Sequence, residues 1–182
     1  MSTRTVGKSP VGAPSDYYVR EILPCAERVA SITYGSSGVG NVTYVPIQII
    51  HPVTVDAVII YNGGVAGNVT VGVYDSVGGL PNALLATSLS TLVAGANSRQ
   101  AVMLTALLSL TPGLYFAARE SSNVGHTILE HYLQARLNAG DGISFYEEEL
   151  GAYLALPALA TPVQSASREY CHHLVLRVAS IP

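Results

Sequence analysis

The stretch that decides the fold reads Val42-Thr-Tyr-Val-Pro-Ile-Gln-Ile-Ile-His-Pro-Val-Thr-Val-Asp-Ala-Val-Ile-Ile-Tyr61. Successive side chains of a β-strand point to opposite faces of the sheet, so apolar residues at every second position indicate a half-buried strand. This alternation begins in Val45–Ile49, pauses at His51-Pro52 and continues at every second residue of Val53–Tyr61. The sequence therefore predicts two strands here and an all-β protein.

The same pattern continues along the rest of the chain. A third alternating run, Val69–Tyr74, follows the turn residues Asn62-Gly63-Gly64. Strands that recur at this short spacing, with clusters of Gly, Asn and Pro between them, are typical of a β-sandwich or barrel. The further predicted strands are Leu84–Leu92, Ala101–Leu108, Leu114–Arg119 and His172–Val178, and the further turns are Gly78-Gly79, Gly95–Asn97 and Thr111–Gly113.

Three segments depart from this pattern. In Ile128–Leu137 apolar residues recur at three and four positions, which predicts a short helix, with an irregular strand as the alternative. Residues 140–166 predict a long loop-like connection with a helical turn near Tyr146–Leu154, and connections of this length are often contact surfaces. Residues 1–16 predict an extended arm, so the single sandwich domain spans residues 17–182. The candidate assembly residues of the arm are Arg4, Lys8, Pro10 and Pro14.

The composition indicates a protein that is short of solvated surface. Charged residues make up 12% of the chain, about half of the usual share. Lys8 is the sole lysine among nine cationic residues, and the chain has eleven Tyr. Lysine is depleted at protein interfaces, whereas Arg and Tyr are enriched there. This composition favours an oligomer or a larger assembly; a well-filled β core with Ser, Thr and Asn on its outer faces is the alternative.

Charge and hydropathy argue against several other classes of protein. The net charge is −3 and no basic run exists, so the electrostatic basis of nucleic-acid binding is missing. The longest uncharged stretches, Ser76–Ser98 and Gln100–Ala118, are interrupted by Gly, Pro, Ser and Thr, which argues against a membrane helix. No apolar segment follows the cationic residues at the N-terminus, so no secretory signal is predicted. In a reducing cytoplasm Cys25 and Cys171 are expected to be free thiols.

Three stretches together resemble a known kind of module: His51–Ile59, Val71–Ala86 and Leu110–Ala118. Their sequence pattern is similar to that of jelly-roll β-sandwiches in tailed-phage tail and virion proteins, in bacterial surface proteins and in carbohydrate-binding-like modules. Asp75–Gly79 fits a turn with positive backbone angles, and Pro112-Gly113 fits a type II turn. The resemblance implies a jelly-roll fold and a place in a phage particle, as a capsid decoration (cement) or tail- or neck-associated subunit assembled in the host cytoplasm.

The residue types that carry catalysis or bind metals form no familiar pattern. His126 and His131 are five positions apart, and the adjacent His172 and His173 point to opposite faces of a predicted strand, so no zinc site is expected. Gly35–Gly40 lacks the lysine of a phosphate-binding loop and precedes a strand where a helix is required. No Gly-x-Ser-x-Gly elbow is present either. We therefore expect a protein without enzymatic activity, cofactor or metal.

Tyrosines are the better candidates for a functional surface. A tyrosine packs its ring while its hydroxyl reaches water or a partner. Sugar-binding platforms favour Trp, which the chain lacks, so contacts with other virion proteins and with copies of this chain are the main hypothesis. A carbohydrate-binding, receptor-recognition module is the alternative. The acidic run Glu147–Glu149 is interpreted as a solvated face, with a cation site or a basic partner as alternatives. The candidate surface residues are Tyr61, Tyr74, Tyr115, Tyr132, Tyr146 and Tyr153.

Overall fold

A computed structural model describes the central part of the chain and shorter stretches on either side of it. The described residues are 17–20, 33–35, 39–132, 146–150, 152–153, 155–164, 170–172 and 174–181. They form strands and turns without any helix, so none of these residues belongs to a helix able to span a membrane. The predicted all-β class is confirmed.

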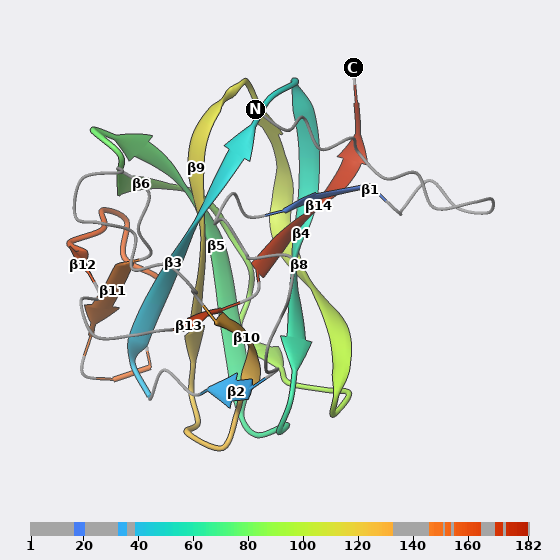
Figure 1. The fold of residues 1–182 in the computed structure, drawn as a ribbon, viewed down its shortest axis with the longest axis vertical. Coiled ribbons are helices and arrows are strands. Elements are labelled where there is room, and N and C mark those ends of the chain that lie inside the picture. The colour runs from blue at the N-terminus through green and yellow to red at the C-terminus, as the bar shows by residue number, and fades with distance from the viewer. Residues whose placement is uncertain are drawn as a thin grey trace.

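Within these residues the chain forms two antiparallel sheets that face each other (Figure 1). The first sheet has the order β1-β14-β4-β10-β13, with β8 beside β4 and β2 beside β10. The second has the order β12-β11-β3-β9-β5-β6, with β7 beside β5. The strands are β1 (Tyr17–Arg20), β2 (Thr33–Gly35), β3 (Asn41–Ile49), β4 (Val53–Asn62), β5 (Asn68–Val77), β6 (Leu80–Thr87), β7 (Thr91–Leu92), β8 (Ser98–Leu110), β9 (Gly113–Ser121), β10 (Ile128–Tyr132), β11 (Tyr146–Glu149), β12 (Val163–Gln164), β13 (Tyr170–His172) and β14 (Leu174–Ser180).

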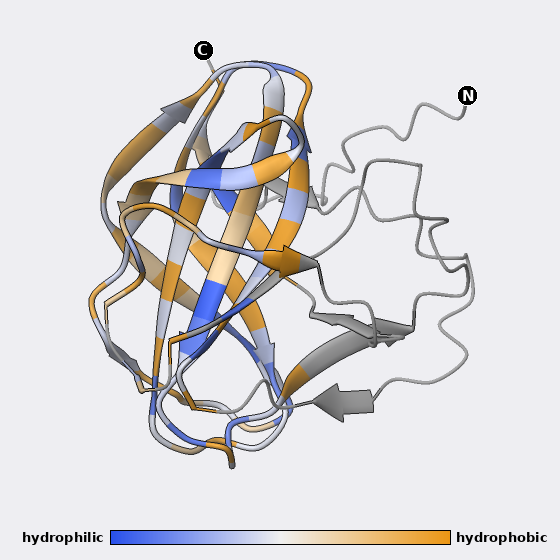
Figure 2. Cartoon of the chain, turned by 90° about the vertical axis from the view of Figure 1, so that its left-hand side faces the viewer, coloured by the Kyte–Doolittle hydropathy of each residue, from blue (hydrophilic) through white to orange (hydrophobic). Residues whose placement is uncertain are grey.

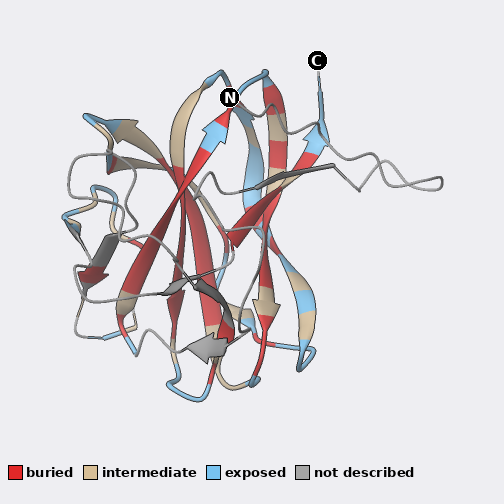
Figure 3. Cartoon of the chain, in the orientation of Figure 1, coloured by how far each residue is buried: buried red, intermediate tan, exposed pale blue. Residues whose placement is uncertain are grey.

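The main hydrophobic core lies between the two sheets and consists of aliphatic side chains. From the second sheet it receives Val45 and Ile47 of β3 and Val71 of β5, and from the first it receives Leu174 and Leu176 of β14. Figure 2 shows hydrophobic and hydrophilic bands alternating along the strands, and Figure 3 shows β3, β5 and β9 buried over most of their length. Burying one such side chain contributes about 1.5–3 kcal/mol, so this core holds the sandwich-like pair of sheets together.

β4 departs from the predicted alternation at Asp56. The register of β4 against β14 shifts there by one residue, and one extra residue exchanges the two faces of a strand. Beyond this bulge Val58 and Ile60 enter the core. The prediction that every second residue of Val53–Tyr61 shares one face is therefore wrong after Val55.

The helix predicted for Ile128–Leu137 is wrong over its described part. Ile128–Tyr132 form β10, whose backbone pairs with β2 and with β13. A spacing of three and four fits a helix, but the context of neighbouring strands overrides a local preference. Tyr146–Glu149 likewise form β11 beside β3 and not a helical turn. Residues 133–145, and with them Leu137, lie outside the described residues.

The predicted turns have mixed outcomes. Gly78 and Gly79 have φ of 62° and 83°, as expected for a two-residue hairpin between β5 and β6. Asp75 contributes differently than expected: its carboxylate accepts the backbone N–H of Ala83 at 2.6 Å and so binds the two strands of the hairpin together. The type II turn at Pro112-Gly113 is wrong, because Gly113 has no positive φ and already pairs with β3.

Candidate interaction surface

The outer face of the second sheet is closed by the chain itself. The described residues of 146–164, here called the strap, cover an aromatic cluster of Tyr44, Tyr74 and Phe116 with Leu156. The rings of Tyr44 and Tyr74 meet edge to face, with centroids 5.1 Å apart at 84°, a geometry worth about 0.5–1.5 kcal/mol beyond the buried area. Gly72 makes room for the strap, because a Cβ there would lie 2.7 Å from Leu156 Cδ1.

Glu148 fastens the strap to the sheet. Its carboxylate accepts the Tyr44 hydroxyl at 2.7 Å, the Thr161 backbone N–H at 2.9 Å and the Thr161 hydroxyl at 2.7 Å. Hydrogen bonds to a charged acceptor are the strong ones, and three of them compensate for its burial at 9% exposure. The solvated face predicted for Glu147–Glu149 is therefore wrong at Glu148; the side chains of the other two lie outside the described residues.

Burial keeps both cluster tyrosines neutral. Desolvation is the largest cause that raises the pKa of Tyr44, followed by its hydrogen bond to Glu148. Desolvation also raises the pKa of Tyr74, whose hydroxyl donates to the Pro157 carbonyl at 2.7 Å. Each hydroxyl thus ties the sheet to the strap as a neutral donor, which is a structural role.

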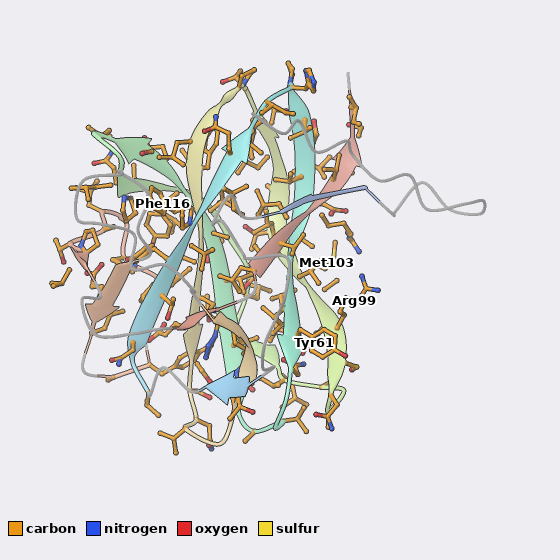
Figure 4. All side chains as sticks on the ribbon, in the orientation of Figure 1. Tyr61, Arg99, Met103 and Phe116 are labelled. Carbon is orange, nitrogen blue, oxygen red and sulfur yellow. The ribbon has the colours of Figure 1, made fainter. Side chains whose placement is uncertain are left out.

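The candidate tyrosines consequently do not form one surface. Tyr74 is fully buried, so its assignment to an exposed surface is wrong. Tyr115 is partly buried against the main core. Tyr61 pairs with Arg99 across β4 and β8, and Figure 4 shows both on the side of the molecule away from Phe116.

The remaining candidates are described only in part. Tyr153 belongs to the strap, and its hydroxyl lies 2.6 Å from Thr70 Oγ1. The backbone of Tyr132 pairs with Tyr170 and that of Tyr146 with Tyr44, but the side chains of Tyr132 and Tyr146 lie outside the described residues. The arm residues Arg4, Lys8, Pro10 and Pro14 also lie outside them, as does Cys25.

Exposed leucines line the seam at which β6 of one sheet meets β8 of the other. Leu104 of β8 forms an isolated antiparallel bridge with Ser88, just after β6, and the Thr105 hydroxyl donates to the last carbonyl of β6 at 2.9 Å. Leu85 precedes Ser88 by three residues and Leu107 follows Leu104 by three residues, so the two leucines flank the bridge along their own strands. Leu85 is 41% exposed and Leu107 is 69% exposed; we call these two residues the seam leucines.

An irregularity in β8 creates the seam. Val55 of β4 pairs with Leu108 and Ala57 pairs with Met103, so the four residues Leu104–Leu107 of β8 lie opposite the single residue Asp56. A bulge of this kind re-aims the backbone and lets β8 reach β6. Ser76–Ala118 supplies these elements and carries one charged residue, Arg99. The same stretch holds seven of the fourteen exposed large apolar residues in the described structure: Val77, Leu80, Leu85, Leu89, Leu92, Met103 and Leu107.

His126 is buried, and its ring contacts hydrogen-bonding side chains of neighbouring segments. His126 Nε2 lies 3.0 Å from Asn62 Oδ1, and its Nδ1 lies 3.1 Å from Ser121 Oγ. Asn62 Nδ2 in turn donates to the carbonyl of Ala94 at 2.7 Å. These contacts join three loops at one end of the sandwich. In the part of the chain that the structure describes, no three His, Cys, Asp or Glu side chains come together as metal ligands would.

A small groove lies between the β6–β7 connection and the strap. Its volume is about 340 Å³, and Ser88, Leu89, Ser90, Tyr153 and Leu156 are among the residues that line it. None of the side chains that line it is charged. Among the candidate tyrosines, Tyr153 lines this groove.

No protein-family model matches the sequence, and a search of curated proteins finds no significantly similar relative.

Proposed function

We propose that the protein is a non-enzymatic structural component of a tailed-phage virion, either a capsid decoration (cement) protein or a tail- or neck-associated subunit. It acts through contacts with other virion proteins and with copies of itself. The observation that carries the proposal is that seven large apolar side chains, the seam leucines among them, are exposed in the stretch Ser76–Ala118, which has a single charged residue. A soluble monomer seldom leaves a large contiguous apolar surface exposed, and such a surface marks a protein contact.

A second copy of the chain is the occupant that best fits the seam. Ser76–Ala118 contributes only Arg99 as a charged residue, and the Arg177–Asp56 pair that reaches Met103 is neutral as a pair, so this region has little net charge to attract a highly charged partner. In a two-fold symmetric contact the same patch faces itself. Leu85 and Leu107 of one copy would then pack on the same leucines of the other, and each pair is removed from water at no cost in buried charge.

The path of the chain supports a jelly-roll arrangement. From β3 onwards the chain crosses to the opposite sheet at β4, returns at β5 and β6, crosses again at β8 and returns at β9. Jelly rolls are built from such crossings between two antiparallel sheets. The assignment to a phage particle rests on the resemblance of His51–Ile59, Val71–Ala86 and Leu110–Ala118 to virion modules, because a fold by itself supports many functions.

The N-terminal arm is proposed as a second means of assembly. Residues 1–16 combine Gly and Pro with polar side chains. This composition suits an extended arm that becomes ordered on a neighbouring subunit. Deletion of residues 1–16 should leave the sandwich folded and weaken assembly. An unfolded deletion variant, detected by circular dichroism, would show that the arm belongs to the core.

Binding to particles tests the proposed function. The full chain is incubated with purified phage capsids and, separately, with purified tails, and pelleted protein is quantified beside a glycan array of the same preparation. We expect saturable binding to one of the two particle parts. A monomer that ignores both and binds only glycans would contradict the proposal and favour the receptor-recognition module instead.

A further inference from the structure

The groove beside Tyr153 contains a directed chain of hydroxyl groups. The Tyr153 hydroxyl donates to Ser90 Oγ at 2.9 Å, and it lies 2.6 Å from Thr70 Oγ1. A hydroxyl has one proton to donate, so the proton between Thr70 and Tyr153 comes from Thr70. Donation therefore runs from Thr70 through Tyr153 to Ser90, and hydrogen bonds in such a chain polarise and strengthen one another.

Ser90 ends this chain as an oriented donor. Its oxygen also accepts the Asn68 side-chain amide at 3.0 Å, so both of its lone pairs are occupied. Only the hydroxyl proton of Ser90 is left to make a hydrogen bond. The residue is exposed and lines the groove, so a ligand in the groove has to present an oxygen acceptor to it.

The rest of the groove is apolar and neutral. Leu89 is 75% exposed and lines the groove together with Leu156 and Ala155. Because no charged side chain lines it, a phosphate, a carboxylate or an ammonium group would lose its hydration without an ion pair in return. The groove thus selects a neutral ligand that has oxygen on one edge and C–H groups on a face.

We propose that this groove binds a single ring of a neutral saccharide. Ser90 donates to a hydroxyl or ring oxygen of the sugar, and Leu89 packs against a C–H face of the ring. The volume of about 340 Å³ is at the small end of ligand sites, which suits one ring. The inference does not rest on the proposed assembly function, because neither seam leucine lines the groove.

Saturation-transfer NMR on the full chain tests the proposal. The probes are glucose, galactose, mannose and N-acetylglucosamine, and one of them is expected to bind with a dissociation constant on the order of 1 mM. Ser90→Ala removes the donor and Tyr153→Phe removes the group that orients it, so each should weaken binding by about 5- to 10-fold. The matched controls Ser109→Ala and Tyr115→Phe, at hydroxyls that do not line the groove, should bind like the wild type.

Leu89→Asp is a second variant that should disturb the groove without unfolding the protein, because the Leu89 side chain is exposed at the rim. This variant should keep the wild-type thermal transition and lose saccharide binding. Glycan arrays with separate arms of bacterial polysaccharides and animal glycans then identify the source of the sugar. Absence of saturation transfer to all four sugars would overturn the proposal, and so would binding that survives both Ser90→Ala and Leu89→Asp.

Discussion

The outer face of the second sheet and the β6–β8 seam are both rich in apolar side chains, but among the described residues only the first is covered by another segment. Over the sheet the strap buries Tyr44, Tyr74 and Phe116 and fixes itself through Glu148. At the seam Leu85 and Leu107 remain exposed. Aromatic residues alone therefore do not indicate an interaction surface: here the aromatic cluster is internal, and the exposed large apolar side chains at the seam are leucines.

The largest expected effect is the difference in the free energy of unfolding between a substitution in the aromatic cluster and one at the seam. Phe116→Ala opens a cavity in the aromatic cluster and should lower the free energy of unfolding by about 3–5 kcal/mol. Leu107→Ala, which shortens an apolar side chain at the exposed seam, should change it by no more than about 0.5 kcal/mol. Urea unfolding followed by circular dichroism measures both. Equal losses would show that the seam is packed within the protomer.

A smaller effect tests how the strap is fastened. In Glu148→Gln the amide oxygen can still accept from Tyr44 and from the Thr161 N–H, but an NH2 group replaces the oxygen that accepts the Thr161 hydroxyl, and the remaining hydrogen bonds lose their charged acceptor. Hydrogen bonds to charged groups contribute about 1.5–3 kcal/mol and neutral ones about 0.5–1.5 kcal/mol, so we expect a loss of about 1–2 kcal/mol in urea unfolding. Limited proteolysis is the second measurement, and Glu148→Gln should accelerate cleavage within residues 146–164. The matched control is Asp75→Asn, at a carboxylate that joins the two strands of the β5–β6 hairpin. This variant should leave the rate of that cleavage unchanged.

Alkaline pH probes the same cluster. In the unfolded chain tyrosines lose their protons near pH 10, whereas burial raises the pKa of Tyr44 and Tyr74 in the folded protein. Stability is therefore complete below pH 10 and falls as the pH rises above it, by about 1.4 kcal/mol at pH 11 for each tyrosine. Tyr74→Phe should reduce the slope of stability against pH between 10 and 11. A slope that is unchanged in this variant would contradict the buried assignment.

Much of the frame follows from the sequence because it depends on local alternation. β3 and β5 alternate apolar with small or polar side chains and lie where the pattern predicts them, whereas the predicted strand His172–Val178 divides between β13, which ends at His172, and β14, which begins at Leu174. In β4 alternation cannot show which side chains face the core, because Ala57–Tyr61 is apolar at every position. The bulge at Asp56 that sets the faces is visible only in the pairing with β14.

The candidate surfaces were harder to predict because they depend on distant residues. The Tyr44–Glu148 hydrogen bond joins positions 104 residues apart, and no local pattern signals it. The seam requires the four residues of β8 that have no partner in β4, Leu104–Leu107, and the bridge between Leu104 and Ser88. The one signal in the sequence was the scarcity of charge in Ser76–Ala118, which shows that the region is uncharged but not which of its leucines are exposed.

Sedimentation equilibrium of the full chain tests the central claim most directly. Three proteins are compared at equal concentrations: the wild type, the double variant Leu85→Glu/Leu107→Glu and the control Val124→Glu. Val124 is an exposed valine in the loop between β9 and β10. We predict an oligomer for the wild type and for the control. The seam variant should be a monomer, because like charges face each other across the contact, and its circular dichroism spectrum should show that it is still folded. A monomeric wild type, or a seam variant of wild-type mass, would contradict the account.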